Sequence, residues 1–211
     1  FPSENKLSLI VPETSTKYSM RTPSTYDRIL ELCEHFTTLI PGNVALFFPS
    51  YYVRDEICKG FSSQKHLLWE KQGMSKEEKE RFLADFKAKK DEGAILLGVT
   101  GANFAEGVDF PGDILNGVVI IGIPLARPNL KTKQTIAYYE GKFGKGWDYG
   151  YTFPAINKCL QSSGRCIRSE TDVGAVIYLD ERFAWQRYYN CFPREGLIVS
   201  KSYEKFLTEF F

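Results

Sequence analysis

The chain has 211 residues, a mass of 24.1 kDa and a formal net charge of +1, from 27 Lys and Arg against 26 Asp and Glu. Hydrophobic residues make up 43% and charged residues 25%, which excludes a disordered tail, a collagen-like fibre and a disulfide-dense mini-protein. The balance also lacks the strong basicity typical of nucleic-acid-binding domains, so any such role must depend on local charge. The chain begins at Phe1 and its first methionine is Met20, and we therefore expect a piece of a larger protein.

Cysteine usage and hydropathy bear on the compartment. The five cysteines form no Cys-x-x-Cys pair, so we expect free thiols and no disulfide framework, zinc site or iron–sulfur cluster in this chain. No signal sequence opens the chain, and the longest apolar stretch, 114–126, is shorter than the ~20 residues that a transmembrane helix needs. These features favour an intracellular protein, cytoplasmic or nuclear, that has no membrane partner.

Strand and helix patterns alternate along the chain. In chain order they predict a strand at 7–11, a helix at 24–40, a strand at 43–48, a weaker strand at 67–69, a helix at 75–92, strands at 94–99 and 118–123, helices at 131–143 and 154–168, a strand at 175–179 and a helix from 202 onward. Short apolar strands that alternate with amphipathic helices predict right-handed crossovers. We therefore expect one α/β domain over residues 1–211, a doubly wound, mostly parallel sheet with helices on both faces.

Ser50 and Tyr51 follow the predicted strand at 43–48. Ligands of parallel sheets gather at the carboxyl ends of the strands. A hydroxyl and the first amides of a helix suit a phosphate group there. A helix N-cap at Ser50 explains the same residues.

The loop at 100–112 follows the predicted strand at 94–99 and is rich in glycine. Glycine loses more chain entropy on folding than other residues, so such a loop predicts close approach of the backbone to a ligand or to a neighbouring segment. Glu106 and Asp109 are suited to orient a cation or a ribose, and turn or capping roles explain them equally.

The predicted helix at 154–168 begins at a proline, as the first turn of a helix allows. At 100° per residue, Gln161, Arg165 and Arg168 lie within about 60° of one another on one helical face. Such a cationic fork suits phosphate oxygens. Gly164 lies on another face, where we expect it to allow close contact with the sheet. Surface ion pairs are the alternative role of the arginines, with the nearby acids Glu170, Asp172 and Glu181.

A basic segment at 127–148 holds five basic residues, Lys142 and Lys145 among them, against two acidic ones. Aromatic residues follow at 147, 149, 151 and 153. Basic and aromatic residues interleaved in this way predict a stacking track for single strands, with packing in the core as the alternative. The chain has no Gly-x-x-x-x-Gly-Lys-Ser/Thr phosphate loop, which argues against a self-sufficient nucleotide-binding enzyme.

Four segments together resemble a known family. Glu106-Gly107-Val108-Asp109 resembles motif V of superfamily 2 helicases, and the stretch from Gln161 to Gly174 resembles motif VI of the XPD-type DNA helicases. The segment 43–51 resembles motif IV of that family, and 178–183 resembles its Asp-x-Arg-Phe element. Order and spacing extend the resemblance over essentially all 211 residues.

The resemblance implies the RecA-like second motor lobe of a 5′-to-3′ DNA helicase active in DNA repair. ATP and Mg²⁺ would be bound mainly by an absent first lobe, which would also carry an iron–sulfur cluster. The implied catalytic residues are Arg165 and Arg168 as arginine fingers and Gln161. Residues that couple ATP to DNA would be Glu106, Gly107, Asp109 and Gly164. Contacts to single-stranded DNA would come from Ser50, Tyr51, Thr100, Gly101, Lys142 and Lys145.

The expected partners are single-stranded DNA, the first motor lobe and possible repair-complex proteins, and no metal site is expected in this chain. The alternative function is a RecA-like lobe that serves as a protein-interaction scaffold without motor activity.

Overall fold

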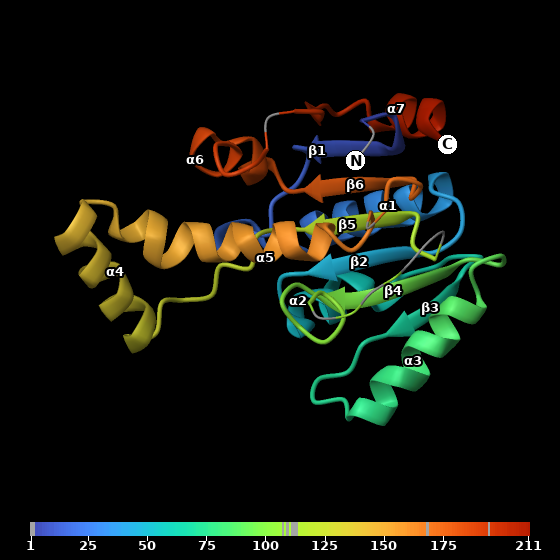
Figure 1. Ribbon diagram of the computed structural model, residues 1–211, viewed down its shortest axis with the longest axis horizontal. Helices are drawn as coiled ribbons and strands as arrows, with labels where there is room; N and C mark the ends of the chain where they lie inside the picture. Colours follow the sequence, from blue (N-terminus) through green and yellow to red (C-terminus); the bar gives the residue numbers. More distant parts are fainter. Residues whose placement is uncertain (1–2, 107, 109, 111–113, 168, 194) are drawn as a thin grey trace.

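A computed structural model describes residues 3–106, 108, 110, 114–167, 169–193 and 195–211. Seven strands form one sheet in the order β3-β4-β2-β5-β6-β1-β7, and every neighbouring pair is parallel (Figure 1). The strands are β1 (Lys6–Val11), β2 (Val44–Phe48), β3 (His66–Trp69), β4 (Ala94–Val99), β5 (Gly117–Ile121), β6 (Gly174–Leu179) and β7 (Leu197–Val199). The predicted parallel α/β sheet is confirmed.

Helices cover both faces of this sheet. They are α1 (Pro23–Leu39), α2 (Tyr51–Ile57), α3 (Lys76–Ala88), α4 (Leu130–Phe143), α5 (Phe153–Ser163), α6 (Gln186–Tyr189) and α7 (Tyr203–Phe210). A π-helix at Asp148–Thr152 precedes α5, and short 3-10 turns lie at Ser3–Asn5, Tyr18–Met20, Cys58–Gly60 and Glu181–Ala184. All of the predicted strands and helices are present, whereas β7 and α6 were not predicted.

Two apolar clusters explain the layers. The buried side chains of α1, α2 and α7 pack against one face of the sheet. Those of α3 and α5 pack against the other face, together with residues from the loop between β4 and β5. The central strands β2, β4, β5 and β6 are buried along their whole length, as continuous apolar runs predict.

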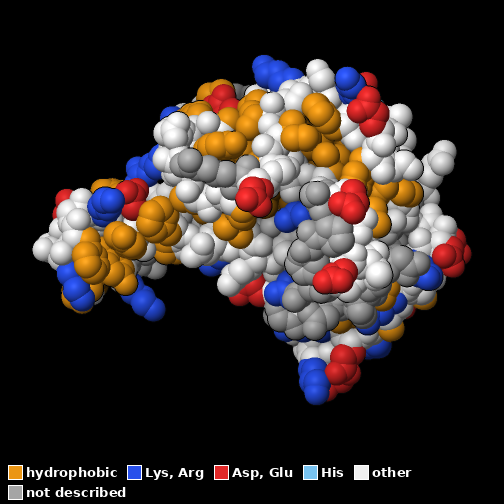
Figure 2. All heavy atoms as spheres, turned by 45° about the horizontal axis from the view of Figure 1, so that its top comes forward, with side chains coloured by type: hydrophobic (Ala, Val, Ile, Leu, Met, Phe, Trp, Pro, Cys, Tyr) orange, Lys and Arg blue, Asp and Glu red, His pale blue; other side chains and the backbone are white. Residues whose placement is uncertain are grey.

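The segment 127–152, which we name the arm, leaves the sheet near the carboxyl ends of the strands and carries α4 outward (Figure 1). None of the residues of α4 is buried. The arm therefore contributes little to the core and presents most of its side chains to solvent. Figure 2 shows hydrophobic side chains exposed on the arm, with Lys and Arg side chains between them.

Two helix ends differ from the sequence prediction. The first helix begins at Pro23, one residue before its predicted start, with Thr22 as its N-cap, whose side chain accepts a hydrogen bond from the Thr25 amide. Helix α5 begins with a proline in its first turn, as predicted, but it ends at Ser163. Gly164 is its C-cap, and residues 165–167 are not helical.

Candidate functional site

Arg165 follows the C-terminus of α5 and binds the loop between β4 and β5 (residues 100–116, here the β4–β5 loop). Its Nε donates to the carbonyl oxygen of Ala105 at 3.2 Å, and its Nη1 donates to that of Val108 at 2.7 Å. Ala105 is fully buried, so one of the two acceptors is fixed in the core. These contacts join the segment that resembles motif VI to the segment that resembles motif V.

The predicted helical face was wrong for Gln161 and Arg165. Because α5 ends at Ser163, Gln161 is helical and Arg165 is not, and the side chain of Gln161 is exposed on the last turn. Arg165 is placed by the turn after the helix, so it does not share a helical face with Gln161. Arg168 lies outside the described residues.

Gly164 also has a different role from the one predicted. Its amide donates to the carbonyl oxygen of Leu160 at 2.9 Å and so closes the last turn of α5. A Cβ on Gly164 would lie 3.3 Å from that same oxygen, and no atom of the sheet is among its nearest neighbours. Gly164 is therefore the C-cap of α5, and the chain continues from it into the turn that holds Arg165.

Gly101 and Glu106 lie together near α5. Gly101 has a φ of +77°, a backbone conformation that favours glycine. A Cβ there would lie 3.1 Å from Lys158 Cδ and 3.6 Å from Glu106 Oε1. The predicted close approach of the loop backbone is confirmed, and its neighbour is a segment of the same chain. Lys158, an exposed cation on α5, was not predicted. The predicted coupling residues Gly107 and Asp109 lie outside the described residues.

Ser50 is the N-cap of α2, and its Oγ accepts a hydrogen bond from the Val53 amide at 3.3 Å. The capping role that the sequence left open is therefore present. Tyr51 follows in the first turn, and its hydroxyl donates to Glu70 Oε1 at 3.2 Å. Burial and the neighbouring carboxylate raise the pKa of Tyr51 to about 12.

Glu70 connects the start of α2 to the β4–β5 loop, and the sequence did not single it out. Its side chain is fully buried, and Oε2 accepts from the Val99 amide at 2.9 Å. Oε1 accepts from the Asn103 amide at 2.7 Å as well as from the hydroxyl of Tyr51. A Cβ on Gly98 would lie 2.9 Å from Oε2, so the glycine leaves room for this carboxylate.

Thr100 lies at the carboxyl end of β4, next to the end of β2. Its amide donates to the carbonyl oxygen of Phe48 at 2.9 Å. Its hydroxyl is buried and has no hydrogen-bond partner within the part of the chain that the structure describes. A buried hydroxyl without a partner is unusual, so Thr100 has hydrogen-bonding capacity for a ligand or a water molecule.

Lys142 lies on α4 and Lys145 follows that helix on the arm. The arm extends beyond the sheet edge at which β2 and β4 end (Figure 1). Lys142 Nζ is 5.6 Å from the ring centre of Tyr138 and 5.3 Å from that of Phe143. The structure thus splits the predicted DNA-binding residues into a sheet-edge group and an arm group. The arm aromatics contact one another, with Tyr139 and Phe143 stacked and Trp147 edge to face with Tyr151, and Trp147 is 51% exposed. The alternative of packing in the sheet core was therefore wrong for this residue.

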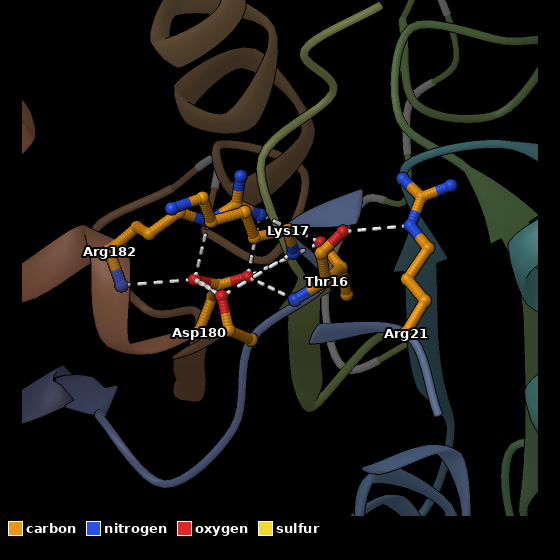
Figure 3. A network of polar contacts seen from close by, with 6 residues as sticks. Thr16, Lys17, Arg21, Asp180 and Arg182 are labelled. Atoms are coloured by element: carbon orange, nitrogen blue, oxygen red, sulfur yellow. Dashed lines mark hydrogen bonds and ion pairs between the residues drawn. The ribbon is translucent and has the colours of Figure 1, made fainter. Parts of the chain in front are cut away.

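A buried ion pair fixes the segment after β1 against the end of β6. Asp180 is fully buried, and its Oδ2 accepts from Arg182 Nη2 at 2.7 Å and from the Thr16 amide at 2.8 Å (Figure 3). Arg182 Nη2 also donates to Thr16 Oγ1 at 2.8 Å. On the far side of this network, Arg21 Nε donates to the carbonyl oxygen of Thr16 at 2.9 Å.

Within the described residues, no group of three or more His, Cys, Asp or Glu side chains lies close enough to hold a metal ion. None of the helices in that same part of the chain has the length and apolar character to cross a membrane.

Four of the five free cysteines are buried, and burial raises the pKa of Cys58 and Cys166 to about 12. These thiols are therefore poor nucleophiles near neutral pH.

The known proteins that this chain resembles are described as helicases. A protein-family model described as "Helicase C-terminal domain" matches residues 33–196. A homolog of regulator of telomere elongation helicase 1 from Oryza sativa is 27% identical over 84% of this chain and 21% of its own length. The ATP-dependent DNA helicase DinG of Photobacterium profundum is 29% identical over 89% of this chain and 27% of its own. A probable ATP-dependent helicase of Methanocaldococcus jannaschii is 36% identical over 69% and 24%.

Solved structures have the same fold. One of XPD helicase matches 88% of this chain and 33% of its own chain with a TM-score of 0.70 at 23% identity. Another, of XPD in the apo form, matches 93% and 40% with a TM-score of 0.73 at 21% identity. The RecA-like α/β fold is confirmed. The chain spans only between 21% and 27% of the length of the three curated relatives.

Proposed function

Because this chain belongs to the helicase C-terminal domain family, we propose that it is the second motor lobe of an ATP-dependent DNA helicase, with residues 1–211 forming one lobe. The resemblance to the C-terminal domain of XPD-type helicases, carried by the motif VI stretch that begins at Gln161, is confirmed by the family model and by the curated relatives. The activity of the whole protein, its 5′-to-3′ direction and a role in DNA repair belong to the proposal.

The observation that carries the proposal is the bond between Arg165 and the β4–β5 loop. ATP would lie between this lobe and a first lobe, where Arg165 and Arg168 would stabilise charge on the transferring phosphoryl group and Gln161 would help to position the phosphate. The Arg165 guanidinium now donates to the carbonyl oxygens of Ala105 and Val108. Turning it toward a phosphate would release those carbonyls, so ATP binding would change the loop. Glu106, Gly107, Asp109 and Gly164 would take part in this coupling.

The chain offers cations for a nucleotide. Arg165 and Lys158 lie beside the β4–β5 loop, and guanidinium groups suit phosphate oxygens. No metal-holding group occurs in the residues described. From the resemblance to XPD-type helicases, we assign Mg²⁺ and most of the ATP contacts to the first lobe, which would also hold any iron–sulfur cluster. When bound, Mg²⁺ would neutralise phosphate charge.

The loop that Arg165 holds also begins with residues proposed to contact DNA. Thr100 has a buried hydroxyl with no hydrogen-bond partner in the described part of the chain, and Gly101 is exposed and has a positive φ. Ser50 and Tyr51 lie at the neighbouring strand end. We propose that these four residues hold the backbone of single-stranded DNA through hydroxyls and amides. Lys142 and Lys145 would contact the strand further out, on the arm.

The test is Arg165→Ala in the full-length protein. Loss of an arginine finger lowers the rate of phosphoryl transfer by ~10³–10⁵. We expect a loss of that order in DNA-stimulated ATP hydrolysis, with affinity for single-stranded DNA changed less than threefold. Arg81→Ala, which removes an exposed arginine from α3, is the matched control and should retain activity. Normal turnover in Arg165→Ala would overturn the finger assignment. A wild-type protein without any DNA-stimulated ATPase would instead favour the protein-interaction scaffold.

A further inference from the structure

The arm exposes a large apolar surface although it lies outside the core. None of the residues of α4 is buried, and Tyr138 on that helix is 60% exposed. The large hydrophobic side chains that the arm exposes are Leu130, Tyr138, Phe143, Trp147 and Tyr149. Figure 2 shows such side chains on the arm beside Lys and Arg side chains. Apolar residues gathered on an exposed surface mark an interaction site.

The arm is a closed helical hairpin. Gly146 and Gly150 pack against Ile136 of α4, because a Cβ on Gly146 would collide with the carbonyl oxygen of Ile136 and one on Gly150 would lie 2.9 Å from its Cγ1. The Glu140 carboxylate accepts a hydrogen bond from the Gly146 amide at 2.7 Å. The surface is therefore formed before any partner arrives, which lowers the entropy lost on binding.

The charge of the arm is one-sided. Its sequence holds two acidic residues, and both have partners: Glu140 accepts from the Gly146 amide, and Asp148 pairs with Arg187 of α6 at 2.9 Å. Within the part of the chain that the structure describes, none of the basic side chains of the arm forms an ion pair with a carboxylate. These exposed side chains are Arg127, Lys131, Lys133, Lys142 and Lys145. The arm therefore has uncompensated positive charge, which favours an acidic partner.

Cations and an aromatic ring share one side of α4. At 100° per residue, Lys131, Tyr138 and Lys142 lie within about 40° of one another, and Ile136 lies more than about 100° away. The Lys142 ammonium is 5.6 Å from the ring centre of Tyr138. Helix α4 has 14 residues and a length of about 21 Å, so a helical segment of about 14 residues matches it in length.

The rings of the arm are poorly placed for base stacking. Tyr139 and Phe143 stack on each other with ring centres 6.1 Å apart, and the Lys142 ammonium lies 5.3 Å from the ring centre of Phe143. An unpaired base needs a free ring face, and these contacts occupy such faces. The remaining exposed parts of the rings suit apolar side chains, because the centres of protein interfaces are rich in Tyr, Trp and Phe. The arm thus favours a protein over a nucleic acid.

We propose that the arm is a docking surface for an acidic protein segment that carries apolar side chains. Tyr138 would be the central apolar contact, and Lys131 and Lys142 would pair with acidic side chains of the segment. The inference goes beyond the proposed function, which assigns Lys142 to the DNA strand. An acidic segment on the arm would compete with that strand for this lysine.

The test is a selection of peptides on the full-length protein from a displayed library of random sequences of about 16 residues. We expect enrichment of sequences that combine Asp or Glu with Leu, Ile or Phe. The affinity of enriched, fluorescently labelled peptides is then measured by anisotropy. Tyr138→Ala should weaken binding by about tenfold or more, as expected for an aromatic residue at the centre of an interface. Tyr138→Phe keeps the ring and should retain the affinity.

Charge is tested by reversal. Lys131→Glu and Lys142→Glu should each weaken binding, and the difference from wild type should shrink at high salt, since salt screens exposed charges. Arg81→Glu makes the same reversal at an exposed position of α3 and should leave peptide affinity unchanged. The substituted positions of α4 are not buried, so the core stays intact in these variants.

Three results would overturn the docking surface. The first is a selection that enriches no acidic, apolar sequences, or only sequences that bind Tyr138→Ala and Lys142→Glu as well as wild type. The second is full displacement of the peptides by poly-glutamate at equal charge concentration, which would show that charge alone is recognised. The third is loss of oligothymidylate binding in Tyr138→Ala without any peptide binding, which would identify a nucleic-acid surface. ATP hydrolysis by Arg165→Ala tests the proposed function separately, so either proposal can fail without the other.

Discussion

Arg165 Nη1 lies 2.7 Å from the carbonyl oxygen of Val108, a hydrogen bond between residues 57 positions apart in the sequence. A second bond from the same side chain, to Ala105, makes Arg165 a clamp on the inner part of the β4–β5 loop. An arginine proposed to reach a phosphate therefore has a structural partner within its own lobe. Binding of Arg165 to a nucleotide can change the β4–β5 loop only if these two hydrogen bonds break.

Arg165→Ala should loosen the β4–β5 loop in the free protein. The loop loses two charge-assisted hydrogen bonds, and local opening depends on such contacts. We expect faster amide hydrogen exchange over residues 101–106, by roughly tenfold. Gln161→Ala, an exposed change on the last turn of α5, should leave that exchange rate unchanged. Equal protection in Arg165→Ala and wild type would show that the clamp does not hold the loop in solution.

Asp180→Ala should destabilise the fold strongly. It leaves the Arg182 guanidinium buried without its carboxylate, a change that typically lowers the free energy of unfolding by about 3–5 kcal/mol. The double variant Asp180→Ala/Arg182→Met removes that stranded charge and should be more stable than Asp180→Ala alone. Urea unfolding measures the free energy of unfolding of the wild type, Asp180→Ala and the double variant. Glu13→Ala breaks the exposed pair with Arg28 and should change stability by only ~0–1 kcal/mol.

Glu70→Ala should also destabilise the fold, for a different reason. It leaves the amides of Val99 and Asn103 without their acceptor, and an unsatisfied buried group costs about 1–3 kcal/mol. We expect a total loss of about 3 kcal/mol in urea unfolding. The pKa of Tyr51 should fall from about 12 toward its usual value, because the carboxylate no longer opposes the phenolate. An unchanged Tyr51 titration would contradict this coupling.

Lys65 should give a pH-dependent contribution to stability. Its Nζ donates to the carbonyl oxygens of Ile40 and Gly42, and burial lowers its pKa from 10.5 to about 8. Between those values the unfolded chain binds more protons than the folded chain, so the free energy of unfolding rises with pH. Wild type should therefore gain stability relative to Lys65→Met from pH 8 to pH 10. Lys133→Met, an exposed change on α4, should not alter the wild-type pH profile in urea unfolding.

The sheet was readily predicted because its central strands are continuous apolar runs. The strand at 44–48 is buried at every position, and the sequence around it contains both a proline and a glycine as breakers. Helix α5 was extended too far, since helical periodicity alone does not register a glycine C-cap at 164. Strand β7 has three partly exposed residues at an edge of the sheet and no periodic signal.

The network around Asp180 was not predictable in the same way. Thr16 and Arg21 lie in a segment without helical or strand periodicity, and nothing local marks them as members of this network. Thr16 meets Asp180 only because β1 pairs with β6. Motif resemblance found Arg165, but it could not show that the arginine holds the backbone of its own lobe. Long-range pairing, not local pattern, decides both features.

The position of β1 has a consequence for how the chain acquires its structure. Leu9 aligns with Ile177 on one side and with Ile198 on the other. During synthesis, β1 emerges before the other six strands of this sheet and therefore stays without either neighbour until β6 and β7 have been made. Contacts so distant in sequence slow folding and leave an apolar strand open to aggregation. Nascent chains of this lobe should accordingly depend on chaperones until β6 has emerged.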